Sequence, residues 1–341
     1  MRALVLTAHG GPEVLKVREA PEPTLGRGQI RIAVRAAGVN FAEIMARQGM
    51  YPAAPKPPAI LGYEVAGTIE SVGEGVTSWC VGDRVIAGTR FNGFAELVVV
   101  GEHDALVLPE ALSFEEGAAV PVAYGTAFVA VTRCGSVQQG DWILIHAVAG
   151  GVGIAATQVA RKLGARIFGT ASKSKHEAVR AQGVEHVIDY HNEDVPKAIR
   201  AITRGRGLDV VLDARGGRHF KESYGLLRPG GRLVMYGASS LVTDERRNLF
   251  SALKMLIGMP RFAPLDLMER NRAVIGLNLL ELWDDRGSFA EIAQPLTRLL
   301  QEGGIEPVVA KVFPLEQAPE AHRFLQQRKN VGKVVLTLSS A

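Results

Sequence analysis

A turn with three glycines in seven residues is the feature of this sequence that most directly suggests chemistry. It reads AVAGGVG and follows the apolar run WILIHA. The dinucleotide fingerprint G-x-G-x-x-G is incomplete because Val148 stands in place of its first glycine, but A-x-x-G-x-x-G fits in full. Glycines let the backbone turn tightly and approach a pyrophosphate, which the free N–H groups of a helix N-terminus then hold. The predicted cofactor-binding residues of this turn are Ala147, Gly150, Gly151, Val152 and Gly153; a glycine loop that serves only close packing is the alternative.

The segment after the next expected strand indicates which dinucleotide is bound. In NAD-binding proteins an acidic residue about 20 residues beyond the glycines hydrogen-bonds the ribose 2′-hydroxyl. Here the segment reads GTASKSKHE, and its first acid is Glu177. Hydroxyl and ammonium groups suit a 2′-phosphate, which a carboxylate would repel. We therefore predict NADPH, bound by Ser172 and Lys175, with NADH left open and a solvated lysine face as the alternative.

These residues need a framework of strands alternating with helices, and the sequence from about residue 120 to 238 has that pattern. Helical periodicity is expected between successive strand-like runs. Strands are expected at 141–147, 165–171, 185–190, 207–214 and 230–238, with helices at 151–164, 173–183, about 193–203 and 219–227. This alternation predicts an α/β fold with a doubly wound parallel sheet of the Rossmann type.

The rest of the chain has a different pattern. Residues 1 to about 120 contain short β-like runs separated by glycine and proline, which predict a small irregular β-barrel or sandwich. The tail mixes strand-like and helical segments, and its last strands could rejoin the N-terminal region. A chain of 341 residues is also longer than a domain with a single hydrophobic core usually is, so we expect two domains.

Composition excludes several classes of function. Hydrophobic residues make up 47% and charged residues 22% of the chain, which is typical of a globular protein, and the net charge of +4 is spread along the sequence. No basic block predicts nucleic-acid binding, and no run approaches the roughly 20 apolar residues of a membrane span. The two cysteines, Cys80 and Cys134, lie in no metal-binding spacing. We expect a cytoplasmic protein with a small-molecule ligand.

Several ordered motifs together resemble the medium-chain dehydrogenase/reductase superfamily, in its quinone oxidoreductase branch. They are AAGVNFAEIMARQGMYP, GYEVAGTIESVGEGVTSWCVGDRV, PVAYGTAF, HAVAGGVGIAATQVAR and LRPGGRLVMYGAS. Further matches, FGTASKSKHEAVRAQGV, NRAVIGLNL and RKNVGKVVL, look most like the subgroup of the vesicle amine transport protein homologues. The resemblance implies a GroES-like catalytic domain at 1–122, a Rossmann NADP-binding domain at 123–265, a segment 266–341 that rejoins the first domain, an active site in the cleft and a homodimer.

Departures from the zinc-dependent members of this superfamily bear on the chemistry. The resemblance places Asn40 where those enzymes carry a zinc-ligating cysteine, and Tyr63 where they carry a zinc-ligating histidine. The four-cysteine structural lobe of those enzymes is also missing from this chain. A catalytic zinc needs three protein ligands, which Glu64 alone does not supply. The resemblance therefore implies a zinc-independent enzyme with no metal site. Such an enzyme suits substrates that are already electrophilic: quinones, enones or enoyl thioesters, including acyl-CoA substrates.

The resemblance also implies roles for residues outside the glycine turn. Asn40 would hydrogen-bond the nicotinamide ribose or a water molecule, Thr126 would contact the nicotinamide end, and Tyr51 would orient the substrate carbonyl or relay a proton. The alternatives are a turn asparagine, a helix-interior hydroxyl and a tyrosine packed on Pro52. Further cofactor contacts are implied for Tyr190, Arg328 and Asn330.

Arginines raise the separate hypothesis of a substrate that itself carries phosphates, such as an enoyl-CoA. Arg215 stands where relatives usually have a neutral residue, and arginine suits phosphate binding. The later arginines are Arg246, Arg247, Arg261, Arg270 and Arg272. Arginines on solvated helices are the alternative explanation. A non-catalytic nucleotide-binding protein of the same fold is the alternative function.

Overall fold

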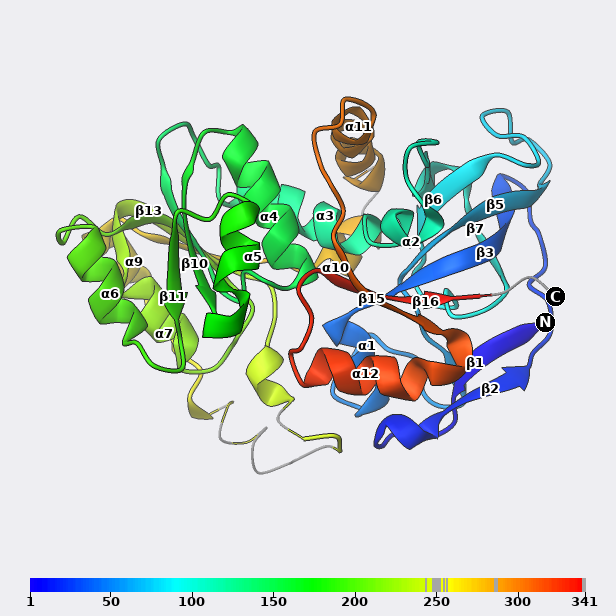
Figure 1. The fold of residues 1–341 in the computed structure, drawn as a ribbon, viewed down its shortest axis with the longest axis horizontal. Helices are drawn as coiled ribbons and strands as arrows, with labels where there is room; N and C mark the ends of the chain where they lie inside the picture. The colour runs from blue at the N-terminus through cyan, green and yellow to red at the C-terminus, as the bar shows by residue number, and fades with distance from the viewer. Residues whose placement is uncertain (243, 247–252, 254, 256, 285–287, 339–341) are drawn as a thin grey trace. The chain divides into compact units, whose positions relative to one another are not determined.

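The chain forms two compact units. The computed structural model describes residues 1–242, 244–246, 253, 255, 257–284 and 288–338, and Figure 1 follows them from the N- to the C-terminus. The first unit comprises Met1–Gly125, Asp244–Arg247 and Leu280–Ala341, and the second comprises Thr126–Thr243 and Asn248–Leu279. The domain boundaries expected from the sequence, after residues 122 and 265, stay predictions.

The second unit is built on a six-stranded parallel sheet in the order β11-β10-β9-β12-β13-β14. The strands are β9 Trp142–Ile145, β10 Arg166–Ala171, β11 His186–Asp189, β12 Leu208–Asp213, β13 Leu227–Met235 and β14 Ala273–Gly276. Every residue of β12 is buried, as expected for a central strand whose sheet is covered on both faces. The predicted doubly wound sheet is confirmed, and β14 extends it at one edge.

Helices flank this sheet on both sides. They are α4 Gly151–Lys162, α5 His176–Ala181, α6 Val195–Ile202, α7 His219–Tyr224 and α9 Pro264–Arg270. In Figure 1, α6, α7 and α9 lie to the left of β10 and β11, and α4 and α5 lie to the right. Ile199 of α6 and Phe220 of α7 share one core with Phe168 of β10. The helix expected over 173–183 begins instead as a 3-10 turn, Lys173–Lys175, before α5.

Strand β13 begins earlier than the sequence indicates. The segment expected at 230–238 runs from Leu227 to Met235. Pro229 and Gly230 favour a later start, since both weaken a strand interior. The structure pairs Leu208 with Leu227, shifts register, and continues with Val210 opposite Arg232. The proline and glycine therefore lie in an irregularity of the strand and not in a turn before it.

The first unit contains a seven-stranded sheet and a three-stranded sheet. The C-terminal strand β16 pairs antiparallel with β3, with Val334 opposite Val39, so the end of the chain returns to the N-terminal region as predicted. Alternate residues of β3, from Ile30 to Val34, point into the core. The strands are β1 Arg2–Leu6, β2 Leu15–Glu19, β3 Gln29–Val39, β4 Ala59–Ile60, β5 Glu64–Val72, β6 Arg84–Gly88, β7 Leu97–Gly101, β8 Ala105–Val107, β15 Val309–Pro314 and β16 Lys333–Thr337.

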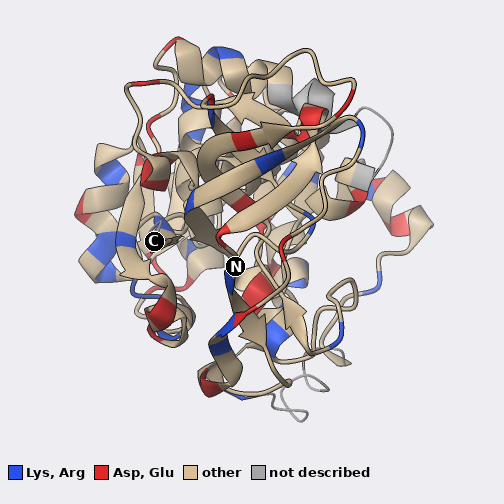
Figure 2. Ribbon diagram, turned by 90° about the vertical axis from the view of Figure 1, so that its right-hand side faces the viewer, with Lys and Arg blue, Asp and Glu red and all other residues tan. Residues whose placement is uncertain are grey.

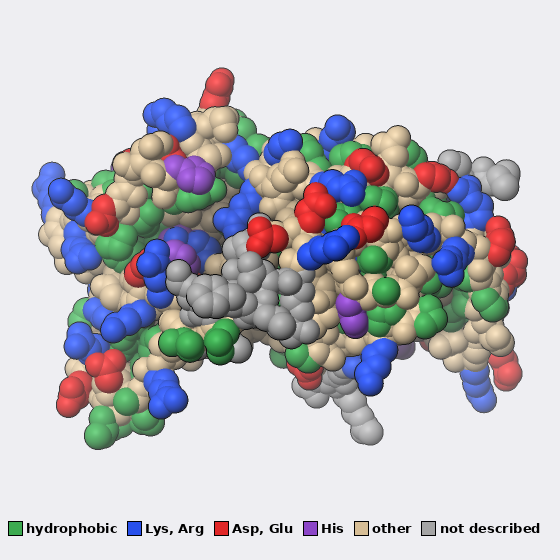
Figure 3. Space-filling view, turned by 90° about the horizontal axis from the view of Figure 1, so that it is seen from below, with side chains coloured by type: hydrophobic (Ala, Val, Ile, Leu, Met, Phe, Trp, Pro, Cys, Tyr) green, Lys and Arg blue, Asp and Glu red, His purple; other side chains and the backbone are tan. Residues whose placement is uncertain are grey.

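Further helices complete the architecture. They are α1 Phe41–Arg47, α2 Phe114–Gly117, α3 Pro121–Phe128, α10 Leu279–Asp284, α11 Ser288–Gln301 and α12 Ala318–Gln326. Acidic and basic residues are interspersed along the ribbon (Figure 2), and the face in Figure 3 likewise mixes apolar and charged side chains. Within the described part of the chain, no helix combines the length and the apolar character that crossing a membrane requires.

Candidate functional site

The glycine turn joins β9 to α4 in the second unit. Ala147 has a φ of +53°, and the Gly150 amide donates to the Ala147 carbonyl over 2.9 Å, which closes the turn. A Cβ atom on Gly153 would lie 2.5 Å from the Ala147 oxygen and 2.6 Å from the Val148 oxygen. Any larger residue at position 153 would therefore force this turn apart.

The N-terminus of α4 is open to an anion. Gly150 supplies no side-chain cap, and the first turn of the helix contains no acidic residue. The first N–H groups of an α-helix have no acceptor within the helix and carry the positive end of its dipole. The amides of Gly151, Val152 and Gly153 are therefore a donor set that fits a pyrophosphate.

The predicted 2′-phosphate segment leaves the next strand of the same sheet. Ser172 follows β10 and begins the 3-10 turn Lys173–Lys175, with its Oγ 3.5 Å from the Oγ of Ser174. Because β9 and β10 are parallel neighbours, their carboxyl ends meet at one edge of the sheet. The structure thus brings the glycine turn and the serine-lysine segment to the same edge.

An acidic residue that the linear sequence pattern did not reveal lies at this edge. Asp189 ends β11 and pairs with Ala171, the last residue of β10. Its carboxylate accepts hydrogen bonds from Asn192 Nδ2 at 2.7 Å and from the His191 amide at 3.1 Å, and the Asn192 bond in particular lowers the pKa of Asp189. Asp189 therefore stabilises its own turn, which also contains Tyr190, one of the predicted cofactor contacts.

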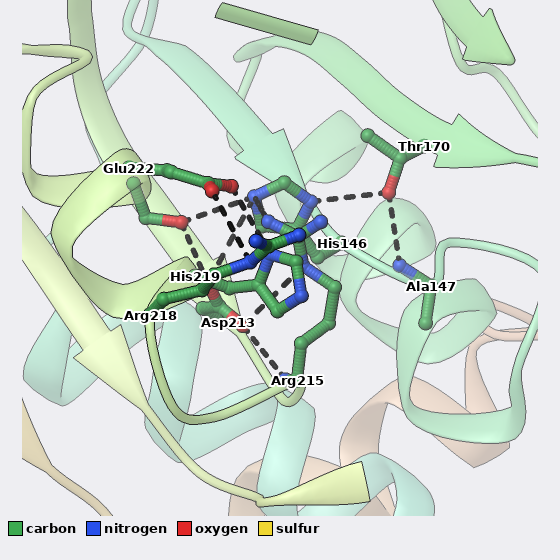
Figure 4. A network of polar contacts seen from close by, with 9 residues as sticks. His146, Ala147, Thr170, Asp213, Arg215, Arg218, His219 and Glu222 are labelled. Atoms are coloured by element: carbon green, nitrogen blue, oxygen red, sulfur yellow. Dashed lines mark hydrogen bonds and ion pairs between the residues drawn. The ribbon is translucent and has the colours of Figure 1, made fainter. Parts of the chain in front are cut away.

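A buried polar network adjoins the glycine turn (Figure 4). His146 Nδ1 lies 3.1 Å from Thr170 Oγ1, and His146 Nε2 lies 3.1 Å from Ser223 Oγ. Thr170 Oγ1 accepts the Ala147 amide at 3.2 Å, and Ser223 Oγ donates to Asp213 at 2.6 Å. Four side chains from β10, β12, α7 and the end of β9, all buried, therefore fix the backbone at the start of the turn.

The charges in this network determine its proton positions. Burial and, to a smaller extent, the charge of Arg215 lower the pKa of His146 to about 3, so the imidazole is neutral near pH 7. Burial alone would raise the pKa of Asp213, but His146, Arg215 and the Ser223 hydrogen bond hold it below its usual value. Ser223 donates to the Asp213 carboxylate, so its oxygen faces His146 Nε2 as an acceptor, while the Arg215 guanidinium, which can only donate, approaches the same nitrogen.

The arginines considered for phosphate binding have protein partners. Arg215 belongs to the network just described: its amide donates to Asp213 at 2.7 Å and its Nη2 lies 3.3 Å from His146 Nε2. The other contacts are Arg246 with Glu13 at 2.8 Å, Arg270 with Asp266 at 2.7 Å and Arg272 with the Tyr224 carbonyl at 3.1 Å. Arg261 is exposed, and Arg247 lies outside the described residues. These contacts support the structural explanation for most of them.

Three further predicted cofactor contacts lie apart from the glycine turn in the sequence. Thr126 is buried in α3, within the second unit. Arg328 and Asn330 belong to the first unit, where Arg328 is exposed with a φ of +54°. Asn330 is buried, and its Nδ2 donates to the Gly332 carbonyl at 2.8 Å, which shapes the turn before β16.

Asn40 is the centre of a charged cluster in the first unit. It caps α1 through a capping box in which its amide donates to Glu43 Oε2 at 2.7 Å. Its side-chain Nδ2 donates to Glu64 Oε1 at 2.9 Å, and its Oδ1 accepts from Lys333 Nζ. Lys333 also forms an ion pair with Glu64. The structure therefore surrounds the predicted asparagine with two buried carboxyl groups and a buried ammonium.

The two carboxyl groups have different environments. Glu64 Oε2 accepts the Val122 amide at 2.8 Å, and its Oε1 accepts from Asn40 and Lys333. Burial raises the pKa of Glu43 to about 8, with Glu64 adding to the rise and Lys333 opposing it. Glu43 is consequently protonated near neutral pH, while Glu64 is the charged partner of Lys333.

Tyr51 and Tyr63 form an aromatic pair in the same unit. Their ring centroids are 6.2 Å apart in an edge-on arrangement, and Phe91 lies 5.2 Å from Tyr63. Burial raises the pKa of Tyr51, with Glu43 and Glu281 adding to the rise, so the phenol keeps its proton. The Tyr63 hydroxyl is buried without a hydrogen-bond partner among the described residues. No hydrogen bond within that set joins Tyr51 to Asn40.

Sequence patterns did not reveal Lys333, Glu43, Thr170, Asp213 or Ser223 as members of these clusters. Glu43 contacts Asn40 through a local capping pattern, which the sequence does contain. The other four reach partners on different elements of the fold. Among the residues that the structure describes, no three histidine, cysteine or acidic side chains gather as a metal-binding group.

Comparisons with known proteins cover nearly the whole chain. A family described as alcohol dehydrogenase GroES-like domain matches residues 26–110, and one described as zinc-binding dehydrogenase matches residues 182–336. The human synaptic vesicle membrane protein VAT-1 homolog is 40% identical over 339 residues, which cover 98% of this chain and 86% of that protein.

Solved structures give the same relationship. The CurK enoyl reductase superposes with a TM-score of 0.87 at 30% identity, covering 99% of both chains. The Escherichia coli quinone oxidoreductase complexed with NADPH has a TM-score of 0.86 at 29% identity, covering 99% of this chain and 100% of the other.

Proposed function

The chain belongs to the medium-chain dehydrogenase/reductase superfamily, in the branch that holds the VAT-1 homologues and the quinone oxidoreductases, and from this premise we propose that it is an NADPH-dependent reductase. Its substrates would be quinones or compounds with a conjugated C=C bond, namely enones and enoyl thioesters. Bound NADPH would supply a hydride to the electrophilic carbon of such a substrate.

The observation that carries this proposal is the edge of the parallel sheet in the second unit. There an uncapped helix N-terminus follows β9, and a serine-lysine turn follows β10. The first supports binding of the pyrophosphate by Gly151, Val152 and Gly153, and the second supports binding of the 2′-phosphate by Ser172 and Lys175. The E. coli quinone oxidoreductase complexed with NADPH is consistent with this choice of cofactor.

Residues of the first unit are proposed to act on the substrate. The Tyr51 phenol, whose pKa is raised by burial, would donate a hydrogen bond to the substrate oxygen that gains negative charge. Asn40 would accept a hydrogen bond from a ribose or substrate hydroxyl. We further propose that the reaction runs without zinc, because the cysteine and histidine ligands of the zinc enzymes are replaced by Asn40 and Tyr63.

A direct assay tests the proposal. NADPH absorbance would be followed with a panel of quinones, small enones and enoyl-CoA thioesters, with the metal content of the same preparation measured in parallel. We expect turnover with at least one acceptor class from protein that contains no stoichiometric zinc. Stoichiometric zinc would contradict the metal-free mechanism. NADPH binding without turnover of any acceptor would contradict the enzyme and favour the non-catalytic nucleotide-binding protein.

A further inference from the structure

Lys333 is a buried cation whose contacts explain how Asn40 is oriented. Lys333 is the first residue of β16, and the next residue, Val334, pairs with Val39 at the end of β3. Lys333 therefore lies beside Asn40, which follows Val39. Its ammonium donates to Asn40 Oδ1 and forms an ion pair with Glu64, and its side chain is only 5% exposed. Building on the proposed reductase, we propose that Lys333 is a positioning residue that fixes the carboxamide of Asn40 for its contact with cofactor or substrate.

Lys333 balances the charge of Glu64. Glu64 is fully buried, and within the described part of the chain Lys333 is the cation at ion-pair distance from it. A buried carboxylate without a counter-charge costs several kcal/mol, and the Lys333 ammonium at ion-pair distance offsets that cost. Glu43 adds no second negative charge near neutral pH because its pKa is raised to about 8. The cluster therefore holds one ammonium and one carboxylate.

Lys333 and Glu64 contact opposite ends of the Asn40 carboxamide. A carboxamide has one oxygen that accepts and one nitrogen that donates. Lys333 can only donate, and the Glu64 carboxylate can only accept. The ammonium therefore selects the oxygen of Asn40, and the carboxylate selects its nitrogen at 2.9 Å. A flipped amide would place its NH2 group against the ammonium and its oxygen against the carboxylate, so only one orientation is favourable.

The functional consequence is a defined acceptor. Asn40 is half-buried, and one lone pair of its Oδ1 is used by Lys333. The second lone pair of that oxygen can accept from a hydroxyl group of cofactor or substrate. Without Lys333, the amide loses the donor that orients its oxygen, and only the contacts to its nitrogen remain. A misplaced binding group of this kind can cost about 100-fold in rate.

A set of four variants separates positioning from simple charge balance. Lys333→Met removes the ammonium with little change of shape, and Lys333→Met/Glu64→Gln removes both charges. Asn40→Ala and Lys333→Met/Asn40→Ala complete the set, with exposed Lys16→Met as the matched control. The measurements are the midpoint of thermal unfolding, the kcat and KM of the acceptor reaction, and the Kd of NADPH from fluorescence.

We expect Lys333→Met to lower kcat/KM by about 10- to 100-fold, and to weaken NADPH binding if Asn40 contacts the ribose. Lys333→Met/Glu64→Gln should recover the unfolding midpoint but not kcat/KM. Adding Lys333→Met to Asn40→Ala should cause no further loss of kcat/KM, because the effects of two substitutions that act through the same group do not add. If Lys333→Met does not fold, the cycle with Asn40→Ala is measured in the Glu64→Gln background.

Two results would overturn the inference. One is full recovery of kcat/KM in Lys333→Met/Glu64→Gln, which would make Lys333 only the counter-ion of Glu64. The other is an equal loss from Lys333→Met with and without Asn40. These results differ from a failure of the proposed function, in which the wild-type protein reduces no acceptor. In that case the Kd of NADPH is compared among the Lys333→Met and Asn40→Ala variants and their combination. An unchanged Kd in all of them overturns the inference.

Discussion

At the scale of single residues, Tyr51 and Tyr63 have similar surroundings but different expected roles. Tyr51→Phe should lower kcat by about 100-fold, with little change in the KM for NADPH, because it removes a hydrogen-bond donor from the developing oxyanion. Tyr63→Phe is the matched control, since the Tyr63 hydroxyl is buried without a partner in the described structure and should leave kcat unchanged. Unchanged kcat in Tyr51→Phe would show that Tyr51 only packs beside Pro52.

Glu43 makes stability depend on pH. Its folded pKa of about 8 lies above the ordinary value of 4.5, so the folded protein binds more protons than the unfolded chain between these values. The contribution of Glu43 to stability is fully present below pH 4.5 and is lost as pH rises to about 8, with a slope of at most about 1.4 kcal/mol per pH unit. Thermal unfolding from pH 5 to 9 should show a decline in the wild type that Glu43→Gln lacks. Parallel curves would contradict the assigned protonation.

At the scale of elements, the β9–α4 turn depends on the absence of one Cβ atom. Gly153→Ala should weaken NADPH binding by about tenfold or more, because overpacking against the Ala147 and Val148 oxygens costs about 1–3 kcal/mol. Gly276→Ala in β14 is the control, since a Cβ there meets nothing within 4 Å. Binding would be measured by titrating NADPH fluorescence, and equal affinities in the two variants would exclude the turn as the pyrophosphate site.

Short-range sequence patterns were enough to predict the parallel sheet of the second unit and the glycine turn. The alternation of strands and helices and the glycine turn could be recognised because each has a short-range signal of periodicity or turn chemistry. The early start of β13 was missed because Pro229 and Gly230 lie inside a strand irregularity that only pairing with β12 and β14 stabilises. The partners of His146 and Asn40 were missed because they come from other elements far along the chain.

At the scale of the whole molecule, we predict a homodimer formed through the second unit. Strand β14 is the last strand of its sheet, and an edge strand offers backbone groups for pairing with a second copy. Light scattering should give twice the chain mass of 36.5 kDa. Val274→Pro should shift the protein to the monomer, because proline removes a backbone donor from that edge. A wild-type monomer, or a dimer unaffected by the proline, would contradict this interface.

The most direct test of the account is the ratio of kcat/KM for NADPH to that for NADH, measured with one accepted substrate. The serine-lysine turn after β10 should give a preference for NADPH of at least about tenfold, since charged hydrogen bonds to a phosphate are strong. Lys175→Ala should remove most of that preference while leaving turnover with NADH unchanged. Equal kcat/KM for NADPH and NADH in the wild-type protein would contradict the account.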